Sequence, residues 1–200
     1  MSEHYYSRQP GVKSEPTTWQ ETLRQKTFSF TSDRGVFSRK GIDFGSRLLI
    51  ESFLEPSVSG PFADVGCGYG PIGLTIASEW SDRNVYMLDV NERAVALSKK
   101  NAARNHISNV TVLQSDLLEA VSNTRFAAIL SNPPIRAGKT LVHQLLEDAY
   151  VQLVQHGELW IVIQKKQGAP SAKKKLESLF GNVVTVAKKK GYYIFKARKD

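Results

Sequence analysis

From Ile42 onward, the chain alternates short apolar runs with stretches that carry apolar residues at helical spacing. This alternation is typical of βα units, whose strands form a largely parallel sheet that helices cover. Strands are expected at Phe62–Val65, Val85–Leu88, Val110–Leu113, Ala127–Leu130, Leu159–Ile163, Val183–Val186 and Tyr192–Phe195. Helices are expected at Asp43–Phe53, Pro71–Trp80, Glu92–Arg104, Thr140–Val154 and Ala172–Phe180. The sequence therefore predicts an α/β fold with seven strands, the last two forming an antiparallel pair.

The segment before this alternation has a different character. It starts with a polar stretch, and Thr27–Thr31 then alternates as a strand would, before a turn at Ser32–Gly35. Val36–Phe37 is the expected return strand of a small hairpin. We therefore expect an N-terminal extension over residues 1–40 and a main domain over residues 41–200. A chain of 200 residues that is 41% hydrophobic can bury the core of one such domain.

The first strand of the main domain ends in a glycine-rich turn with Asp64, Gly66, Gly68 and Gly70, followed at once by Pro71. Glycine permits positive φ and lets a ligand approach the backbone, and proline suits the first turn of a helix. The turn is therefore expected to bind a ligand. Residues 68–73 also match the G-x-G-x-x-G pattern of dinucleotide-binding proteins, so the turn alone does not separate a dehydrogenase from a methyltransferase.

Carboxylates follow the next two strands. Asp89 ends the second strand, about 20 residues after the turn, where it can accept hydrogen bonds from two ribose hydroxyls. NAD and S-adenosylmethionine share that ribose, so Asp89 is compatible with either cofactor. Asn91 either caps the next helix or borders an adenine. Asp116, after the third strand, either holds the exocyclic amine of adenine or caps a short helix at Leu117–Leu118.

The fourth strand runs directly into Asn132, Pro133 and Pro134. Prolines cannot donate to a β-ladder, so this end of the strand is a stiff turn with no evident packing role. An amine conjugated to a base or an amide is a poor nucleophile, but two acceptors that bind its hydrogens can direct its lone pair at a methyl group. The Asn132 side-chain oxygen and the Pro133 carbonyl are candidate acceptors. Catalysis would then consist mainly of positioning, which can contribute about 7–11 kcal/mol.

In their order and at their strand ends, these motifs resemble those of class I S-adenosylmethionine-dependent methyltransferases. Gly35–Ser38 and Asp43–Ser46 resemble the entry segment of the RsmC-like ribosomal small-subunit guanine-N2 methyltransferases, and Gln164–Ala169 is similar too. The resemblance implies a Rossmann-like sheet of order 3-2-1-4-5-7-6, S-adenosyl-L-methionine as cofactor, and guanine of 16S ribosomal RNA as acceptor. It further implies cofactor contacts from Asp64, Gly66, Gly68, Gly70, Asp89, Asn91, Asp116 and Asn132.

Two features depart from that family. Many members carry an aromatic residue after Asn-Pro-Pro that stacks on the flipped base, whereas this chain has Ile135. Base stacking can contribute roughly 1–3 kcal/mol, so Phe37, which the resemblance places between donor and acceptor, is expected to compensate or the base is held differently. Well-studied members also have a second N-terminal domain that helps to recognise substrate. The exact nucleotide target therefore stays open.

The net charge of +8 is concentrated at the C-terminal end. Residues 157–200 contain 11 Lys or Arg and 3 Asp or Glu, whereas the other 156 residues contain 16 of each sign. In the implied strand order, Lys165 and Lys166 emerge beside Asn132, with Arg136 and Lys139 on the adjacent loop. Such cations suit the phosphates of an RNA, in particular ribosomal RNA or the small ribosomal subunit. A solvated face that promotes solubility is the alternative.

Composition argues against disulfide-linked, membrane-spanning and metal-binding proteins. Cys67 is the only cysteine, which excludes an intrachain disulfide and fits a cytoplasmic protein, and no apolar stretch is long enough to span a membrane. The histidines show no metal-ligand spacing. The leading hypothesis is an RNA guanine-N2 methyltransferase. The alternatives are methylation of a protein glutamine amide or of adenine N6, a nicotinamide-dependent oxidoreductase, and a non-catalytic RNA-binding protein. The sequence does not indicate an oligomeric state.

Overall fold

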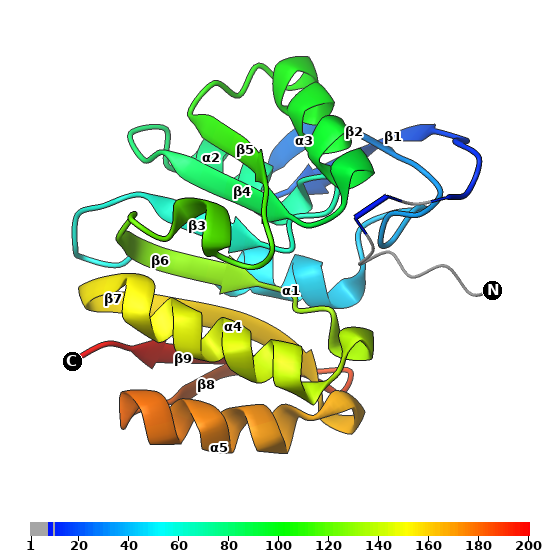
Figure 1. The fold of residues 1–200 in the computed structure, drawn as a ribbon. Coiled ribbons are helices and arrows are strands. Elements are labelled where there is room, and N and C mark those ends of the chain that lie inside the picture. The colour runs from blue at the N-terminus through cyan, green and yellow to red at the C-terminus, as the bar shows by residue number, and fades with distance from the viewer. Residues whose placement is uncertain (1–7, 10) are drawn as a thin grey trace.

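The computed structural model describes residues 8–9 and 11–200. A seven-stranded sheet forms the centre of the protein (Figure 1). Its strands lie in the order β5-β4-β3-β6-β7-β9-β8, which is the expected 3-2-1-4-5-7-6 when counted within this sheet. Neighbours from β5 to β7 are parallel, and β9 is antiparallel to both β7 and β8. The strands are β3 (Phe62–Val65), β4 (Val85–Asp89), β5 (Val110–Gln114), β6 (Phe126–Ser131), β7 (Leu153–Gln164), β8 (Val184–Lys189) and β9 (Tyr192–Arg198). The predicted Rossmann-like fold is confirmed.

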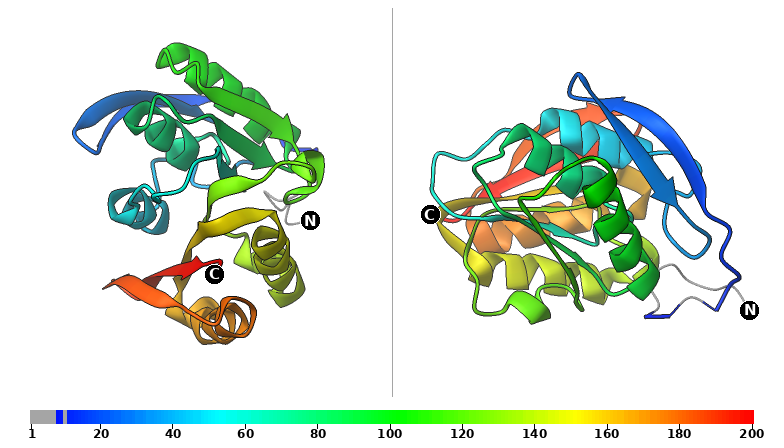
Figure 2. Two further views of the ribbon diagram at one scale, coloured as in Figure 1. Left: turned by 90° about the vertical axis from the view of Figure 1, so that its left-hand side faces the viewer. Right: turned by 90° about the horizontal axis from the view of Figure 1, so that it is seen from above.

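Helices cover both faces of this sheet (Figure 2). On one face lie α1 (Phe44–Ser52), α2 (Pro71–Glu79) and α3 (Glu92–Arg104), and on the other lie α4 (Lys139–Gln152) and α5 (Ala169–Phe180). Each layer buries its own apolar cluster against the sheet, with Phe53 and Trp160 in the first and Phe126 and Leu146 in the second. β3 and β6 are buried over their whole length, as central strands of a doubly covered sheet should be.

The N-terminal hairpin differs from the expected one. Its strands are β1 (Thr17–Leu23) and β2 (Lys26–Ser32), so the partner of the predicted strand precedes it in the chain. The prediction of a return strand at Val36–Phe37 is wrong. The hairpin turn consists of Arg24 and Gln25, both with positive φ, and neither is a residue that signals such a turn. Residues 1–7 and 10, the polar start of the predicted extension, lie outside the described residues.

Asn101 of α3 connects this hairpin to the glycine-rich turn. Its side-chain amide accepts a hydrogen bond from the Thr31 N–H at 2.9 Å and donates to the carbonyl oxygens of Thr31 and Tyr69, at 2.9 and 2.8 Å. Phe30 and Tyr69 pack edge to face with their centroids 5.8 Å apart. The hairpin therefore shares a core with the main domain and buttresses the loop that follows β3.

Smaller differences concern the ends of elements. β7 starts at Leu153, six residues earlier than predicted, and α4 therefore ends at Gln152. The short helix predicted at Leu117–Leu118 is instead a 3-10 turn, η1 (Glu119–Val121). Within the described residues, no helix combines the length and apolar character that crossing a membrane requires.

Candidate active site

A cavity of about 350 Å³ opens at the carboxyl ends of β3, β4 and β6. Its volume lies within the usual range for small-molecule sites. Of the residues predicted from the sequence, it is lined by Gly66, Gly68, Asp89, Asp116, Asn132, Pro133, Pro134 and Phe37. The predicted residues that do not line it are Asp64, Gly70, Asn91, Ile135, Arg136, Lys139, Lys165 and Lys166.

The glycine-rich turn forms one wall of this cavity. Gly66 and Gly68 have φ of 78° and 59°, and a Cβ added to either would meet no atom within 4 Å. These two glycines therefore leave backbone exposed to the space that a ligand would fill. Gly70 has a packing role instead, because its Cβ would lie 2.8 Å from Cε of Met87. Gly70 is therefore needed for a different steric reason from Gly66 and Gly68.

Asp89 lies beside this turn at the end of β4. Its Oδ2 accepts a hydrogen bond from the Gly68 N–H and its Oδ1 accepts one from the Asn91 N–H, each at 2.8 Å. Burial raises the pKa of Asp89 to about 6, against the effect of those two hydrogen bonds. Each carboxylate oxygen keeps a lone pair for a further donor, so Asp89 can both shape the turn and bind hydroxyl groups of a ligand.

Asn91 takes the first of its two predicted roles. It is the N-cap of α3, where its side-chain oxygen accepts hydrogen bonds from the N–H groups of Arg93 and Ala94. Its side-chain nitrogen donates to the Gly35 carbonyl at 2.7 Å. The residue is fully buried and ties the segment before Phe37 to the start of α3.

Asp64 lies beneath the cavity. Its Oδ2 accepts a hydrogen bond from the Gly73 N–H at 2.8 Å, and its buried Oδ1 has no partner among the described residues. Burial, with a smaller contribution from the nearby Asp89, raises the pKa of this carboxyl to about 7, against the effect of the hydrogen bond from Gly73. Asp64 therefore keeps its proton in the folded protein at pH values where it is ionised in the unfolded chain.

This difference predicts a pH-dependent effect of Asp64→Asn on stability. Between about pH 4 and pH 7 the folded state binds more protons than the unfolded state, so raising the pH destabilises the fold. From pH 5 to pH 8, the free energy of unfolding of the wild type should fall relative to that of Asp64→Asn by on the order of 2 kcal/mol. Urea unfolding at several pH values measures it. Asp82→Asn, at an exposed carboxylate, is the control, and parallel curves for Asp64→Asn and the wild type would contradict the prediction.

Asp116 faces the cavity from the loop after β5. Its side chain is exposed and accepts no hydrogen bond from the described residues, whereas Ser115 Oγ accepts one from the Ala120 N–H at 3.0 Å. The predicted alternative in which Asp116 caps a helix therefore does not hold. Its carboxylate is available to a ligand.

Asn132 follows β6, which runs between β3 and β7, and it reaches the cavity from the centre of the sheet. Its Nδ2 donates to Asp43 Oδ1 and Ser46 Oγ, at 3.2 and 3.0 Å. A carboxylate only accepts hydrogen bonds, so the oxygen of the amide faces the other way. The Pro133 carbonyl accepts a hydrogen bond from the Ile135 N–H at 2.8 Å, which leaves it one lone pair.

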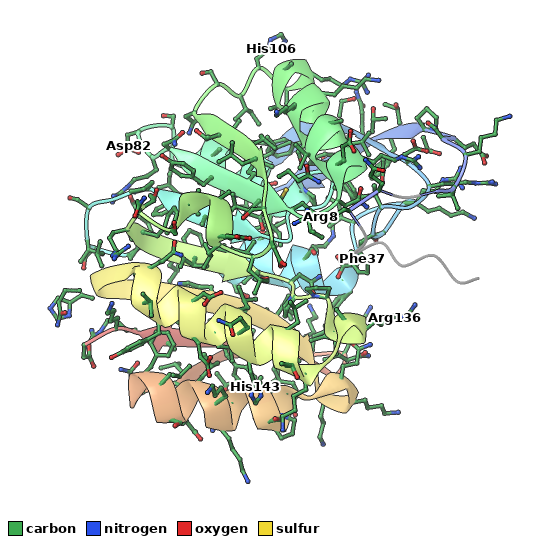
Figure 3. The ribbon with its side chains drawn as sticks, viewed as in Figure 1. Arg8, Phe37, Asp82, His106, Arg136 and His143 are labelled. Atoms are coloured by element: carbon green, nitrogen blue, oxygen red, sulfur yellow. The ribbon has the colours of Figure 1, made fainter. Side chains whose placement is uncertain are left out.

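Phe37 and Ile135 lie in different surroundings. Phe37 lines the cavity with a relative exposure of 41%, and Figure 3 shows it on the same side of the molecule as Arg136. Ile135 starts the 3-10 turn η2 (Ile135–Ala137) and packs on the apolar cluster beneath α4. The position after Asn-Pro-Pro is thus partly buried against this cluster and does not line the cavity, whereas Phe37 does.

Basic residues surround this edge of the sheet without lining the cavity. Lys165 and Lys166 form the turn η3 (Lys165–Gln167) after β7, and both are exposed. The turn between β8 and β9 lies beside them, because the Lys165 N–H bonds the Gly191 carbonyl at 2.7 Å. Lys190 of that turn lies 4.9 Å from the ring centre of Phe44, next to Asp43. By contrast, Lys173 and Lys175 are in ion pairs with Glu177 and Glu147 on the helices.

Sequence reasoning did not identify Asp43, Ser46 and Tyr69 as site residues, although all three line the cavity. Asp43 carried a recognisable signal, since an aspartate just before an amphipathic helix is a typical N-cap. The contact between Asp43 and Asn132, 89 positions apart, had no sequence signal. Among the described residues, no group of three or more His, Cys, Asp or Glu side chains is placed to hold a metal ion.

The chain is similar to one uncharacterized protein and to proteins that are described as methyltransferases. It is 62% identical over 200 residues, the full length of both chains, to the uncharacterized protein YbxB of Bacillus subtilis (strain 168). It is 30% identical over 197 residues to the ribosomal RNA large subunit methyltransferase G of Klebsiella pneumoniae (strain 342), covering 95% of this chain and 51% of that protein. The chain thus spans about half the length of the second relative.

A solved structure of a methyltransferase is also similar to this chain. The 16S rRNA N2 G1207 methyltransferase RsmC of Thermus thermophilus, in complex with AdoMet and guanosine, superposes with a TM-score of 0.82 at 25% identity. The match covers 96% of this chain and 52% of that one. The model of the family described as "Methyltransferase small domain" matches residues 27–196. Since this match covers most of the chain, the protein belongs to the methyltransferase small domain family.

Proposed function

We propose that this protein transfers a methyl group from S-adenosylmethionine to the exocyclic N2 of a guanine in ribosomal RNA, with 16S RNA of the small subunit as the first candidate. The observation that carries the proposal is the orientation of Asn132. Its Nδ2 is held by Asp43 and Ser46, which leaves its oxygen with no donor among the described residues and free to accept from a ligand in the cavity that Asn132 lines. Such an enzyme would act in the cytoplasm, together with the ribosomes that it modifies.

The hydrogen-bonding groups that line the cavity suit those of S-adenosylmethionine. Gly66 and Gly68 leave open space where a Cβ would otherwise project, which suits the methionine part of the cofactor. Asp89 would accept hydrogen bonds from the ribose hydroxyls and Asp116 from the adenine amine. Asp64 lies below the turn, where its Oδ2 accepts a hydrogen bond from the Gly73 N–H and its Oδ1 has no partner in the part of the chain that the structure describes. When bound, the cofactor supplies an electrophilic methyl group on a sulfonium.

Asn132 and Pro133 would orient the acceptor amine. The Asn132 oxygen and the remaining lone pair of the Pro133 carbonyl accept its two hydrogens, so that the nitrogen lone pair points at the methyl group. As the N–CH₃ bond forms, the S–CH₃ bond would break and leave the neutral thioether of the cofactor. No strong base is required before transfer, because the nitrogen becomes acidic once it is alkylated and its surplus proton can pass to water. Phe37, at the rim of the cavity, would stack on the base in place of the aromatic residue that Ile135 replaces.

The acceptor assignment can be tested directly. The protein would be incubated with labelled S-adenosylmethionine and, in separate reactions, with small subunits, large subunits, free ribosomal RNA and transfer RNA from an unmodified source. Digestion and chromatography then identify the labelled nucleoside. N2-methylguanosine from ribosomal RNA is the expected product. Label found only in protein would overturn the proposal, and label in large-subunit RNA would correct the subunit.

The exposed lysines of η3 predict that their replacement weakens RNA binding and lowers its dependence on salt. In Lys165→Ala/Lys166→Ala, the affinity for RNA should fall to a similar extent for all sequences. The slope of log affinity against log salt should decrease by about 1 per lysine that contacts a phosphate. Fluorescence anisotropy with labelled RNA at several salt concentrations measures both. Lys99→Ala/Lys100→Ala removes the same charge from the exposed side of α3 and should have little effect. Equal effects of the two double variants would argue against a specific RNA-binding edge.

Methylation of adenine N6 or of a protein glutamine is the alternative, because Asn132 and the prolines that follow it can orient those amines in the same way. The surroundings of Asn132 favour RNA, since Arg136, Lys165 and Lys166 all lie at this edge of the sheet. A polyanionic substrate suits such a set of cations better than a protein loop does.

A further inference from the structure

The side-chain amide of Asn132 is held at one end by the start of α1. Its Nδ2 donates to Asp43 Oδ1 at 3.2 Å and to Ser46 Oγ at 3.0 Å, so both amide hydrogens have an acceptor. None of the described residues donates a hydrogen bond to the amide oxygen, and Asn132 lines the cavity. The amide therefore has one fully engaged end within the protein and one end left for a ligand.

The acceptors of that amide are themselves fixed. Asp43 is the N-cap of α1, and its Oδ1 also accepts a hydrogen bond from the Ser46 N–H at 3.0 Å. The first turn of α1 fits closely against β9, because a Cβ on Gly45 would lie 3.0 Å from the ring of Tyr192. Farther along the helix, Leu49 and Phe53 are fully buried. Asp43 Oδ1 thus caps the N-terminus of a well-packed helix and also accepts a hydrogen bond from Asn132.

We propose that Asp43 and Ser46 are positioning residues for Asn132, an inference that rests on the proposed function of Asn132 in methyl transfer. They keep the amide from turning over, and a reversed amide would present N–H groups to the hydrogens of the acceptor amine. The amine would then lose its acceptor and the direction of its lone pair. A residue that acts only as a helix cap would affect stability and leave turnover of the folded enzyme unchanged.

Ser46→Ala is the most direct test, because it removes the hydroxyl and leaves the backbone N–H that Asp43 caps. We expect kcat to fall about 10- to 100-fold, with the affinity for S-adenosylmethionine and the KM for RNA changed less than about threefold. Thr75→Val is the matched control. Thr75 is also buried, and among the described residues its hydroxyl donates only to the Pro71 carbonyl of its own helix, at 2.7 Å. An unchanged kcat in Ser46→Ala would overturn the role of Ser46.

Two replacements of Asp43 separate positioning from capping. Asparagine at this position keeps an oxygen that can accept from both the Ser46 N–H and the Asn132 amide, whereas alanine keeps none. Asp43→Asn should therefore retain most of kcat, and Asp43→Ala should lose about 10- to 100-fold even when the fraction of folded protein is matched. Equal turnover of the two variants at equal folded fraction would contradict the inference.

A measurement on the free protein distinguishes failure of this inference from failure of the proposed function. The side-chain amide signals of Asn132 in a nitrogen-labelled sample can be assigned by their absence in Asn132→Ala. In Asp43→Ala and Ser46→Ala these signals should shift and their hydrogens should exchange faster with water, whereas Thr75→Val should leave them in place. Unchanged signals would overturn the inference whatever the acceptor is. A wild type that methylates no RNA would overturn the proposed function alone.

Discussion

Asn132→Ala is expected to remove methyl transfer while leaving the affinity for S-adenosylmethionine nearly unchanged. The substitution deletes the side-chain acceptor that is proposed to bind the acceptor amine, whereas the proposed contacts to ribose and adenine come from Asp89 and Asp116. Removing one polar group that acts on the reacting atoms typically lowers kcat about 100- to 1,000-fold. Single-turnover transfer of a labelled methyl group to RNA measures the rate, and calorimetry measures cofactor binding.

Asn123→Ala provides the matched control for this experiment. Asn123 is an exposed asparagine in the loop before β6, at the opposite end of the strand that leads to Asn132. Its replacement should change neither rate nor affinity. If Asn132→Ala lowered cofactor affinity as much as it lowered the rate, Asn132 would belong to the cofactor site and not to the acceptor site.

The main sheet was predictable because its signals are local. Phe62–Val65 and Glu92–Arg104 were predicted with the bounds that the structure has, and both are delimited by glycine, proline or capping residues close by. The strand order came from the family resemblance, since a parallel sheet with helical connections carries no sequence signal for which strands are neighbours. The early start of β7 was missed, because Leu153 and Val154 continue the apolar spacing of α4.

The hairpin was mispaired for a specific reason. A two-residue hairpin turn of type I′ needs positive φ at both positions, for which sequence analysis relies on glycine, asparagine or aspartate. Here Arg24 and Gln25 adopt that conformation, while the nearest residues that signal a turn lie at Ser32–Gly35. The turn expected there does form, since the Val36 N–H donates to the Asp33 carbonyl at 3.3 Å, but no strand follows it. The predicted strand instead pairs with the segment before it, and Phe28 and Phe30 pack in the core.

The site shows the same division between local and long-range information. Gly68, Asp89 and Asn132 could be predicted because each lies at a strand end, and parallel strands bring those ends together. The burial of Ile135, by contrast, depends on how η2 packs under α4. The amide orientation of Asn132 depends on where the first turn of α1 lies. Neither arrangement is encoded in spacing along the chain.

Asp89→Ala is expected to lower the affinity for S-adenosylmethionine by roughly 100-fold or more, since hydrogen bonds to a charged group contribute about 1.5–3 kcal/mol each. The substitution would also remove the acceptor for the Gly68 N–H, and that hydrogen bond holds the glycine-rich turn at the cavity. Calorimetric titration with the cofactor measures it. Asp82→Asn is the control, because Figure 3 shows Asp82 on the opposite side of the molecule from Phe37. Unchanged affinity in Asp89→Ala would show that the ribose is bound elsewhere.

The pH dependence of binding gives an independent test of Asp89. Burial raises the pKa of this carboxyl to about 6, so the free protein takes up a proton there as the pH falls through that value. A carboxylate accepts hydrogen bonds from ribose hydroxyls better than a protonated carboxyl does, and cofactor binding would therefore favour release of the proton. Affinity in the wild type should decrease as the pH is lowered below about 6 and level off above it. In Asp89→Asn, which has no proton to release, the affinity should be low and this dependence should disappear.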